Sequence, residues 1–344
     1  MREILGGIVQ HPWFEPTGWE DFTSGRREMN PRQRYYVFLD VETCFESNWP
    51  AYGRGYQANS DRFGGRRVRP KVSAPCRRLE NCEYLHKALN SSVFLHRGRN
   101  STHDRRHVIM IYFDCRGSGV NAKLRAEIFP DAPIALVSMS SSKTQLQGEF
   151  DQGLPPPAAT SIELDEVQKE QIQDCDERSR PYKLSFIGNF RHFIRTELQF
   201  LHNGDTFIVL NNTELNQQRP NETYTDILAK SQFAATPRGD NLFTYRFTEV
   251  LASGAIPVVL ADHWVLPFRP ELVDWTGCAV IIPEGRAITT EHVVNAISSE
   301  EICRRRKRCY QIYESYIISA TKTVAAIVDG LELVGIPGPE EKLL

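Results

Sequence analysis

Long apolar runs are missing from this sequence. No stretch approaches the roughly 18 consecutive apolar residues that a membrane-spanning helix requires. The opening residues, MREILGGIVQHPW, turn polar too early for a secretory signal peptide. We therefore expect the chain as given to be soluble.

Several functional signatures are also absent. Neither the G-x-x-x-x-G-K-(S/T) loop nor the G-x-G-x-x-G turn occurs, which argues against a P-loop kinase or a dehydrogenase. No pair of cysteines has the C-x-x-C spacing of a zinc site. The formal net charge is only -2, so electrostatics give no reason to expect a nucleic-acid partner.

Cysteines and glycosylation sequons are present, and both fit a secretory protein. Cys76, Cys82 and Cys115 resemble a disulfide framework in the N-terminal half. Cys303 and Cys309 lie six residues apart on an expected helix and are poorly placed to bond each other. The sequons begin at Asn90, Asn100, Asn211 and Asn221.

The most informative stretch runs from Ser231 to Phe268. It opens with a turn-forming cluster, Pro237–Asp240, and Thr244 is then a candidate helix N-cap. Apolar residues follow at helical spacing until Gly254, which is expected to end the helix. The next residues, Ile256–Leu260, have the pattern of a strand buried on both faces. A loop, helix and strand in this order form half of a nucleotide-binding unit.

Arg246 and Glu249 lie on one face of the first turn of this expected helix. An arginine at the positive end of a helix is unfavourable unless an anion is nearby. A diphosphate bound to the free N–H groups, with Arg238 adding charge and Glu249 accepting from ribose hydroxyls, would satisfy both residues. Asp262, at the carboxyl end of the next strand, is another candidate contact. The alternative is a solvated Arg/Glu pair beside a core helix.

These residues resemble the nucleotide-sugar-binding half of an exostosin-type glycosyltransferase. The resemblance includes the Arg238-Gly239 turn, the R-F-x-E helix start from Arg246, the G-x-IPV strand and the W-x-LPF segment from Trp264. It extends upstream to KLSFIGNFRHFIRTEL, where Gly188 and Arg195 match. Downstream it runs through VDWTGCAVIIPE, around Trp275 and Glu284, to the late helix that contains Tyr310, Tyr313 and Ser315. The N-terminal match, HRGRNSTHDRRHVIMIYFD, is thinner and includes Gly98, Arg99, Asn100 and His107.

The resemblance implies an α/β protein of the GT-B fold, with two Rossmann-like domains facing a central cleft. Residues 1–155 would form the acceptor-side domain and residues 156–330 the nucleotide-sugar domain, with a tail at 331–344. The interdomain linker is expected in the run Gly153 to Ser161, which breaks regular structure. The last long helix would return to the first domain. Members of that family are typically held in the Golgi by an N-terminal membrane helix, so this sequence is expected to be a lumenal fragment, an incomplete sequence or a departure from that plan.

The implied reaction is transfer of a sugar, of hexosyl or glucuronosyl type, from a UDP-sugar to a glycan or glycoconjugate acceptor, with inversion. The donor-binding candidates are Gly188, Arg195, Arg238, Arg246, Glu249 and Asp262. Arginines and a helix N-terminus can stabilise the leaving diphosphate, so no metal or other cofactor is required. Asp174-Cys175-Asp176 spells a D-x-D metal motif, but its polar surroundings and the lack of a preceding strand favour a solvated loop.

The catalytic base is expected in the first domain or the cleft. Candidates are Asp114, His107 and Asp151. Each has a structural alternative, since Asp114 can cap a loop, His107 can be a satisfied strand histidine and Asp151 can start a turn. Trp264 can stack on the base or sugar, or it can belong to a hydrophobic plug under the cleft.

A second class of function is a catalytically inactive exostosin-like subunit, or a glycan-binding partner of an active transferase. Damage at the donor site would mark it, yet the matching arginines and glutamate are present. The expected partners are the nucleotide sugar and the glycan acceptor, with homo- or hetero-oligomers of related transferases also considered. The expected location is the Golgi lumen, or a membrane-associated site in the secretory pathway.

Glycine, proline and polar clusters between the apolar segments predict the bounds of the remaining elements. The opening 30 residues are predicted irregular, and the arginine-rich run Cys303–Arg308 is predicted to be one solvated helix face. Strands are predicted at 35–40, 93–95, 107–113, 135–139, 183–187, 206–210, 233–236 and 256–260, and helices near 80 and at 193–203, 224–231 and 299–328.

Overall fold

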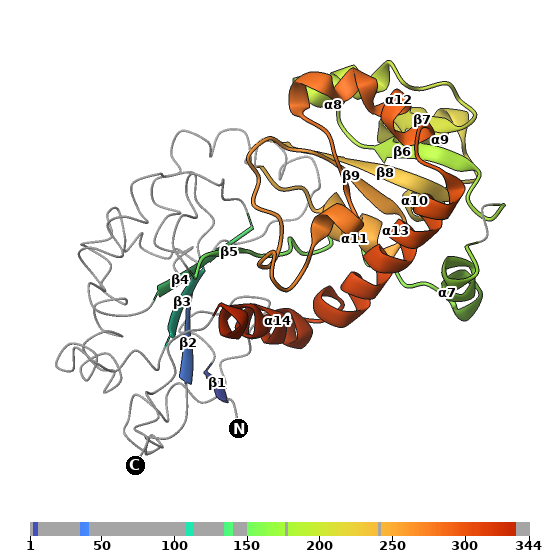
Figure 1. The fold of residues 1–344 in the computed structure, drawn as a ribbon. Coiled ribbons are helices and arrows are strands. Elements are labelled where there is room, and N and C mark those ends of the chain that lie inside the picture. The colour runs from blue at the N-terminus through green and yellow to red at the C-terminus, as the bar shows by residue number, and fades with distance from the viewer. Residues whose placement is uncertain are drawn as a thin grey trace, which may run out of the picture. The chain divides into compact units, whose positions relative to one another are not determined.

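The structure, a computed structural model, describes short segments of the N-terminal part and most of the C-terminal part. The described residues are 3–5, 35–40, 108–112, 134–139, 150–175, 178–239 and 242–334. The chain forms two compact units (Figure 1). The first unit extends to Gln152 and the second begins at Gly153, except that Met139 also belongs to the second unit. Each unit is built around its own sheet. The predicted α/β class with parallel sheets is confirmed.

The first unit contains five strands that lie side by side in chain order. They are β1 (Glu3–Leu5), β2 (Tyr35–Asp40), β3 (Val108–Tyr112), β4 (Ile134–Ser138) and β5 (Gln152–Gly153). The pairings from β1 to β4 are parallel. The prediction of an irregular N-terminus is wrong at β1, which is too short to show a periodicity in the sequence.

The second unit has a sheet with the order β10-β9-β8-β6-β7, and its pairings are parallel. The strands are β6 (Tyr182–Ile187), β7 (Phe207–Leu210), β8 (Ser231–Pro237), β9 (Ile256–Leu260) and β10 (Val280–Ile281). Residues on both faces of β9 are buried, as its unbroken apolar run predicted, and β7 is buried in the same way. In a parallel sheet, the carboxyl ends of all the strands lie at one edge and the amino ends at the other.

Helices cover both faces of this second sheet. The helices of the second unit are α7 (Glu166–Gln173), α8 (Phe193–Gln199), α9 (Asn212–Gln218), α10 (Tyr224–Ala229), α11 (Arg246–Ala252), α12 (Thr290–Asn295), α13 (Ser299–Ile312) and α14 (Ala320–Leu333). Figure 1 shows α10, α11 and α13 over one face and α8 and α12 over the other. The side chains of Phe186, Phe233 and Phe247 are fully buried between these layers.

The helix predictions need correction. The helix predicted at 193–203 ends at Gln199, and the helices α7, α9 and α12 were not predicted. The late helix is interrupted by a π-helix, η7 (Tyr313–Ile317), between α13 and α14. Residues 154–165 form neither helix nor strand, although Gly153 itself ends β5.

The prediction that the run Cys303–Arg308 is a solvated face is wrong for two of its arginines. Arg306 is fully buried. Arg305 donates to the carbonyl oxygens of Thr276 and Ala279, at 3.0 and 2.9 Å. Arginines on one turn of a helix point in different directions, so a run of charge cannot all face solvent.

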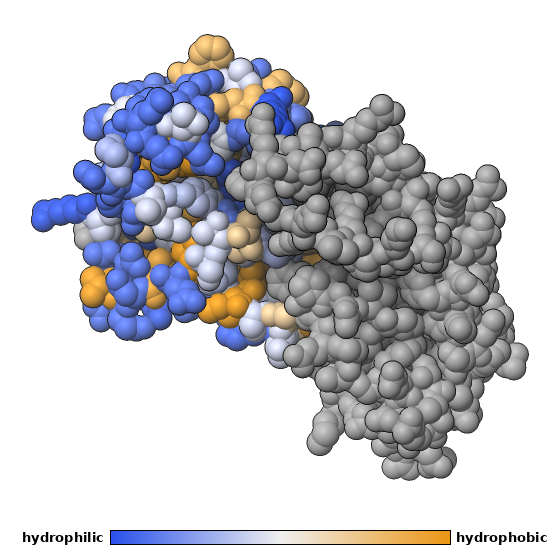
Figure 2. All heavy atoms as spheres, turned by 180° about the vertical axis from the view of Figure 1, so that it is seen from behind, coloured by the Kyte–Doolittle hydropathy of each residue, from blue (hydrophilic) through white to orange (hydrophobic). Residues whose placement is uncertain are grey.

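Two disulfides attach α13 to its surroundings. They join Cys175 to Cys303 and Cys278 to Cys309. Cys303 and Cys309 therefore do not bond each other, as predicted, whereas the N-terminal cysteines lie outside the described residues. None of the described helices is long and apolar enough to cross a membrane. The face of the second unit in Figure 2 is mostly hydrophilic, with smaller apolar areas between.

Candidate functional site

The carboxyl ends of β6, β8 and β9 lie together at one edge of the second sheet, here called the carboxyl edge. Ile187 pairs with Leu210, and Pro237 pairs with Leu260, so the loops after these strands begin level with one another. The chain passes from β6 outward to β7 and then returns across β6 to β8. The strand order therefore reverses between β6 and β8, and open α/β sheets bind ligands at such a point.

Arg246 reaches this reversal point from the first turn of α11. Its Nε donates to the carbonyl oxygen of Ile187 at 2.9 Å, and its guanidinium lies 5.0 Å from the ring centre of Phe186. A Cβ on Gly188 would lie 2.4 Å from Nη2 of Arg246. Gly188 therefore matters because its lack of a side chain leaves room for the guanidinium.

The start of α11 differs from the prediction. Tyr245, not Thr244, takes the N-cap position, and it makes no side-chain cap. Thr244 contributes its carbonyl oxygen, which accepts from the N–H of Phe247. The end of the helix is as predicted, because Gly254 adopts a φ of 72°.

Arg195 braces the loop after β8 from the side of α8. It is buried, and its Nε donates to the carbonyl oxygen of Arg238 at 3.1 Å. Its Nη1 donates to Oδ1 of Asn189 at 3.1 Å. A Cβ on Gly239 would lie 2.8 Å from Nη2 of Arg195, so this glycine also makes room for a guanidinium. Arg195 thus holds the backbone of the Arg238-Gly239 turn.

Arg238 follows β8 and stays partly exposed. Its backbone N–H donates to the carbonyl oxygen of Leu260, which fixes the turn against β9. Its Nη1 lies 3.6 Å from Oε1 of Glu284. Its Nε is buried, and no described residue accepts a hydrogen bond from it. A buried donor of this kind is costly unless a ligand or water pairs with it.

Glu284 is a candidate site residue that the sequence placed within the family resemblance but did not propose as a ligand contact. It is buried at the start of the 3₁₀ helix η6 (Glu284–Thr289), just after β10. Its Oε1 accepts from the N–H of Asp262 at 2.8 Å, and its own N–H donates to Oδ1 of Asp262 at 3.1 Å. This exchange joins the loops after β9 and β10. The available signal was a Pro-Glu pair directly after an apolar strand.

Glu249 is a buried carboxylate held by two groups of the protein. Its Oε1 accepts from the N–H of Thr160 at 2.8 Å, and its Oε2 accepts from the hydroxyl of Tyr224 at 2.5 Å. Burial, reinforced by the negative charge of Glu249, raises the pKa of Tyr224. The alternative of a solvated Arg/Glu pair is wrong, because Glu249 is only 3% exposed.

Trp264 belongs to a hydrophobic plug, which was one of the two alternatives for this residue. It is buried, its Nε1 donates to the carbonyl oxygen of Met139 at 2.8 Å, and its ring packs edge-on against Phe247. Trp275 packs against the same phenylalanine. Both tryptophans therefore pack against the buried side of α11, and Trp264 has little surface left for stacking on a ligand.

The candidate bases are only partly covered by the structure. His107 and Asp114 lie outside the described residues. Asp151 is 9% exposed and precedes β5 in the first unit. In the D-x-D segment, Asp174 is the exposed C-cap of α7, Cys175 is in a disulfide and Asp176 is not described. The described residues contain no group of three or more metal-binding side chains.

Comparison with protein families gives one decisive match. The exostosin GT47 domain matches residues 90–297, which is more than half of the chain and includes the whole carboxyl edge. The chain belongs to the exostosin GT47 family. As a member, it is a glycosyltransferase-family protein, and the resemblance inferred from its motifs is confirmed.

The relatives of this exostosin-family protein are distant. An exostosin-1 homolog of Caenorhabditis elegans is 29% identical over 212 residues, which cover 56% of this chain and 55% of that protein. Exostosin-1 of Drosophila melanogaster is 31% identical over 166 residues, or 42% of this chain and 22% of the relative. The chain therefore matches about half of the first relative's length and less of the second.

Among solved structures, two similar ones cover nearly the whole chain at 11% identity. The N-terminal domain of a Candida albicans trehalose-6-phosphate phosphatase has a TM-score of 0.39 and covers 96% of this chain and 97% of that one. WaaG, a glycosyltransferase of lipopolysaccharide biosynthesis, has a TM-score of 0.36 and covers 95% and 98%.

The two disulfides and the exostosin relatives together indicate a protein of the secretory pathway. Disulfides persist in oxidising compartments and are rare in the cytosol.

Proposed function

We propose that this exostosin-family protein transfers a sugar from a UDP-sugar to a glycan or glycoconjugate acceptor, with inversion at the anomeric carbon. The observation that carries the proposal is the set of arginines at the carboxyl edge. Arg195, Arg238 and Arg246 come from three different elements and meet where the strand order reverses. Arg195 is buried and the other two arginines are partly buried, and cations gathered in such surroundings favour an anionic ligand.

A diphosphate fits the groups that this edge offers. Nε of Arg238 is a buried donor for which no described residue is an acceptor. Arg246 uses its Nε on the backbone of β6, which directs the rest of its guanidinium past Gly188. Phosphate oxygens would accept from both arginines, and the same contacts would stabilise the negative charge that develops as the diphosphate leaves.

Glu249 is proposed to orient the ribose of the donor. Each of its carboxylate oxygens already accepts one hydrogen bond, from Thr160 and from Tyr224. A carboxylate oxygen can accept a second one, so ribose hydroxyls would complete its coordination rather than replace it. Asp262 is proposed as a further contact because it follows β9 at the same edge.

The acceptor hydroxyl would attack the anomeric carbon from the side opposite the diphosphate, and a base would take its proton. Asp114, Asp151 and His107 remain the proposed bases, of which Asp151 is the one that the structure describes. The arginines would supply the charge that a metal supplies elsewhere, so we propose transfer without a metal. The proposed location is the Golgi lumen.

The test is a transfer assay. The purified protein is incubated with a panel of UDP-sugars and glycan acceptors, with and without excess EDTA. The expected result is transfer of one sugar with inverted anomeric configuration, at a rate that EDTA does not change. Loss of transfer on chelation, restored by manganese, would contradict metal independence. Binding of UDP without transfer to any acceptor would favour the inactive-subunit alternative.

A further inference from the structure

Two of the four glycosylation sequons fall on described residues, and their surroundings differ. The sequons at Asn90 and Asn100 lie outside the described residues. Those at Asn211 and Asn221 flank the helix α9 in the second unit. A folded protein can carry a large oligosaccharide only where the asparagine side chain reaches solvent.

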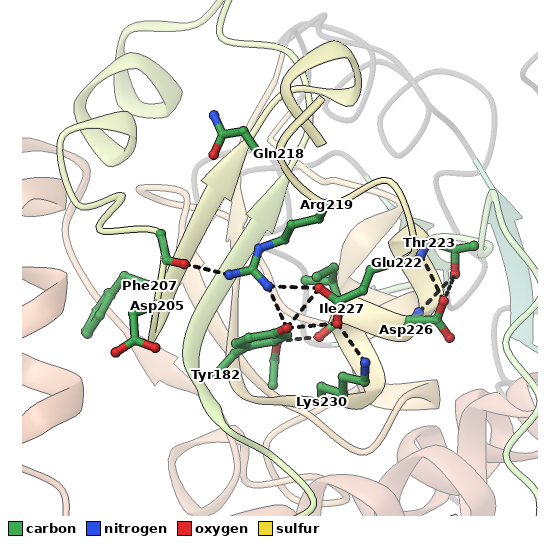
Figure 3. A network of polar contacts seen from close by, with 12 residues as sticks. Tyr182, Asp205, Phe207, Gln218, Arg219, Glu222, Thr223, Asp226, Ile227 and Lys230 are labelled. Atoms are coloured by element: carbon green, nitrogen blue, oxygen red, sulfur yellow. Dashed lines mark hydrogen bonds and ion pairs between the residues drawn. The ribbon is translucent and has the colours of Figure 1, made fainter. Parts of the chain in front are cut away.

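Asn221 lies in the exposed turn between α9 and α10. No described residue hydrogen-bonds its carboxamide. The residues on either side are fixed, because Arg219 donates to the carbonyl oxygen of Gly204 at 2.6 Å and also to Glu222 at 2.9 Å. Figure 3 shows Arg219 and Glu222 within a network that includes Tyr182 and Lys230. Asn221 is thus an exposed position on a well-anchored turn.

The turn also lies away from the carboxyl edge. Tyr182, whose hydroxyl donates to Glu222 at 2.8 Å, is the first residue of β6. The Glu222 side of the turn is therefore near the amino end of that strand, whereas Gly188 follows its carboxyl end. An oligosaccharide on Asn221 would leave the carboxyl edge clear.

Asn211 is in the opposite situation. It is half-buried and caps α9, since its Oδ1 accepts from the N–H of Glu214 at 2.9 Å, while its own N–H donates to Oε2 of Glu214 at 2.8 Å. It directly follows Leu210, whose carbonyl oxygen accepts from the N–H of Gly188. An oligosaccharide here would stand at the carboxyl edge beside Gly188.

We propose that Asn221 carries an N-linked oligosaccharide in the folded protein and that Asn211 does not. In the reaction, Nδ2 of Asn221 attacks the anomeric carbon of a lipid-diphosphate-linked oligosaccharide. The new C–N bond replaces the C–O bond to the diphosphate, which leaves as the anion, and the amide proton passes to solvent. The proposal rests on passage through the secretory pathway, and the exclusion of Asn211 rests in part on the proposed donor function of the carboxyl edge.

The experiment expresses the whole chain behind a secretion signal in a eukaryotic cell. N-glycans are removed enzymatically in isotopically labelled water, and peptides are identified by mass spectrometry. The label is expected on Asn221 in most molecules and not on Asn211. On gels, Asn221→Gln should lose the mass of one oligosaccharide, while Asn211→Gln should migrate like the parent. Thr223→Ser keeps the sequon and should also migrate like the parent.

An unlabelled Asn221 in secreted, folded protein would overturn the proposal, as would equal labelling of Asn211. The wild-type peptides decide the question even if a variant fails to fold. Because the readout is mass and not activity, it is independent of UDP binding. A failed transfer assay and a failed glycan assignment are therefore distinguishable.

Discussion

At the scale of single residues, the site depends on side chains that are absent as much as on those that are present. A Cβ added at Gly188 or at Gly239 would lie within 3 Å of a guanidinium nitrogen. Any larger residue would push Arg246 or Arg195 out of place. Neither glycine has a positive φ, so the need for space beside the guanidinium, and not the backbone conformation, accounts for glycine at these two positions.

The first prediction concerns Gly188→Ala. The added Cβ should displace the guanidinium of Arg246 and weaken UDP binding by about 1.5 to 3 kcal/mol, the typical worth of a hydrogen bond to a charged group. Calorimetry with UDP measures the change. Gly277→Ala is the matched control, because its Cβ would meet only Nη1 of Arg304 at an ordinary 3.9 Å. Equal affinities in the two variants would show that Gly188 has no such role.

The second prediction concerns Tyr224→Phe. Removing the hydroxyl takes one donor from the buried carboxylate of Glu249, which should lower the free energy of unfolding by about 1 to 3 kcal/mol. Urea unfolding at neutral pH provides the measurement. Tyr313→Phe serves as the control, since no described residue hydrogen-bonds the Tyr313 hydroxyl. A Tyr224→Phe variant as stable as the control would mean that Glu249 does not need this donor.

At the scale of elements, the sequence predicted the strands better than the helix ends. The sequences of β7 and β9 are wholly apolar, because a parallel strand that is buried on both faces needs apolar residues at every position. The seven-residue helix α9 was missed because it shows too few turns for a period, although its capping box, Asn211 with Glu214, was present. The buried Arg306 could not be foreseen, because only packing decides which arginine of a run faces inward.

The third prediction concerns the network that ties α9 and α10 to β6 (Figure 3). Burial alone would raise the pKa of Glu222, but hydrogen bonds from Lys230, Arg219 and Tyr182 outweigh it and lower the pKa from 4.5 to about 2. A carboxylate with a lowered pKa stabilises the fold above its unfolded pKa. This contribution should be lost as the pH falls from about 4.5 through about 2.

Unfolding measured across that pH range should therefore show a steep loss of stability in the parent and a shallower one in Glu222→Gln. Glu300→Gln, at an exposed position on α13, should keep the parent's slope. An identical slope in all three proteins would mean that the network does not couple protonation to folding.

At the scale of the whole molecule, the proposed donor-binding residues all belong to the second unit, while the proposed bases belong to the first. The sequence proposed Arg238 from a turn-forming cluster, Arg246 from a helix start and Arg195 from the family resemblance. The resemblance included Glu284, but not among the proposed contacts, because its position depends on a contact between the loops after β9 and β10. The sugar and the acceptor depend on side chains that no motif fixes.

The most direct test of the central claim is calorimetry of UDP binding to the parent and to Arg246→Ala. Arg304→Ala is the control, because Arg304 is an exposed arginine on α13 that pairs with Glu301. We expect the parent and the control to bind UDP equally and Arg246→Ala to lose about 1.5 to 3 kcal/mol, which is roughly 10- to 150-fold in affinity. Unchanged UDP affinity in a folded Arg246→Ala protein would contradict the assignment of the carboxyl edge as a donor site.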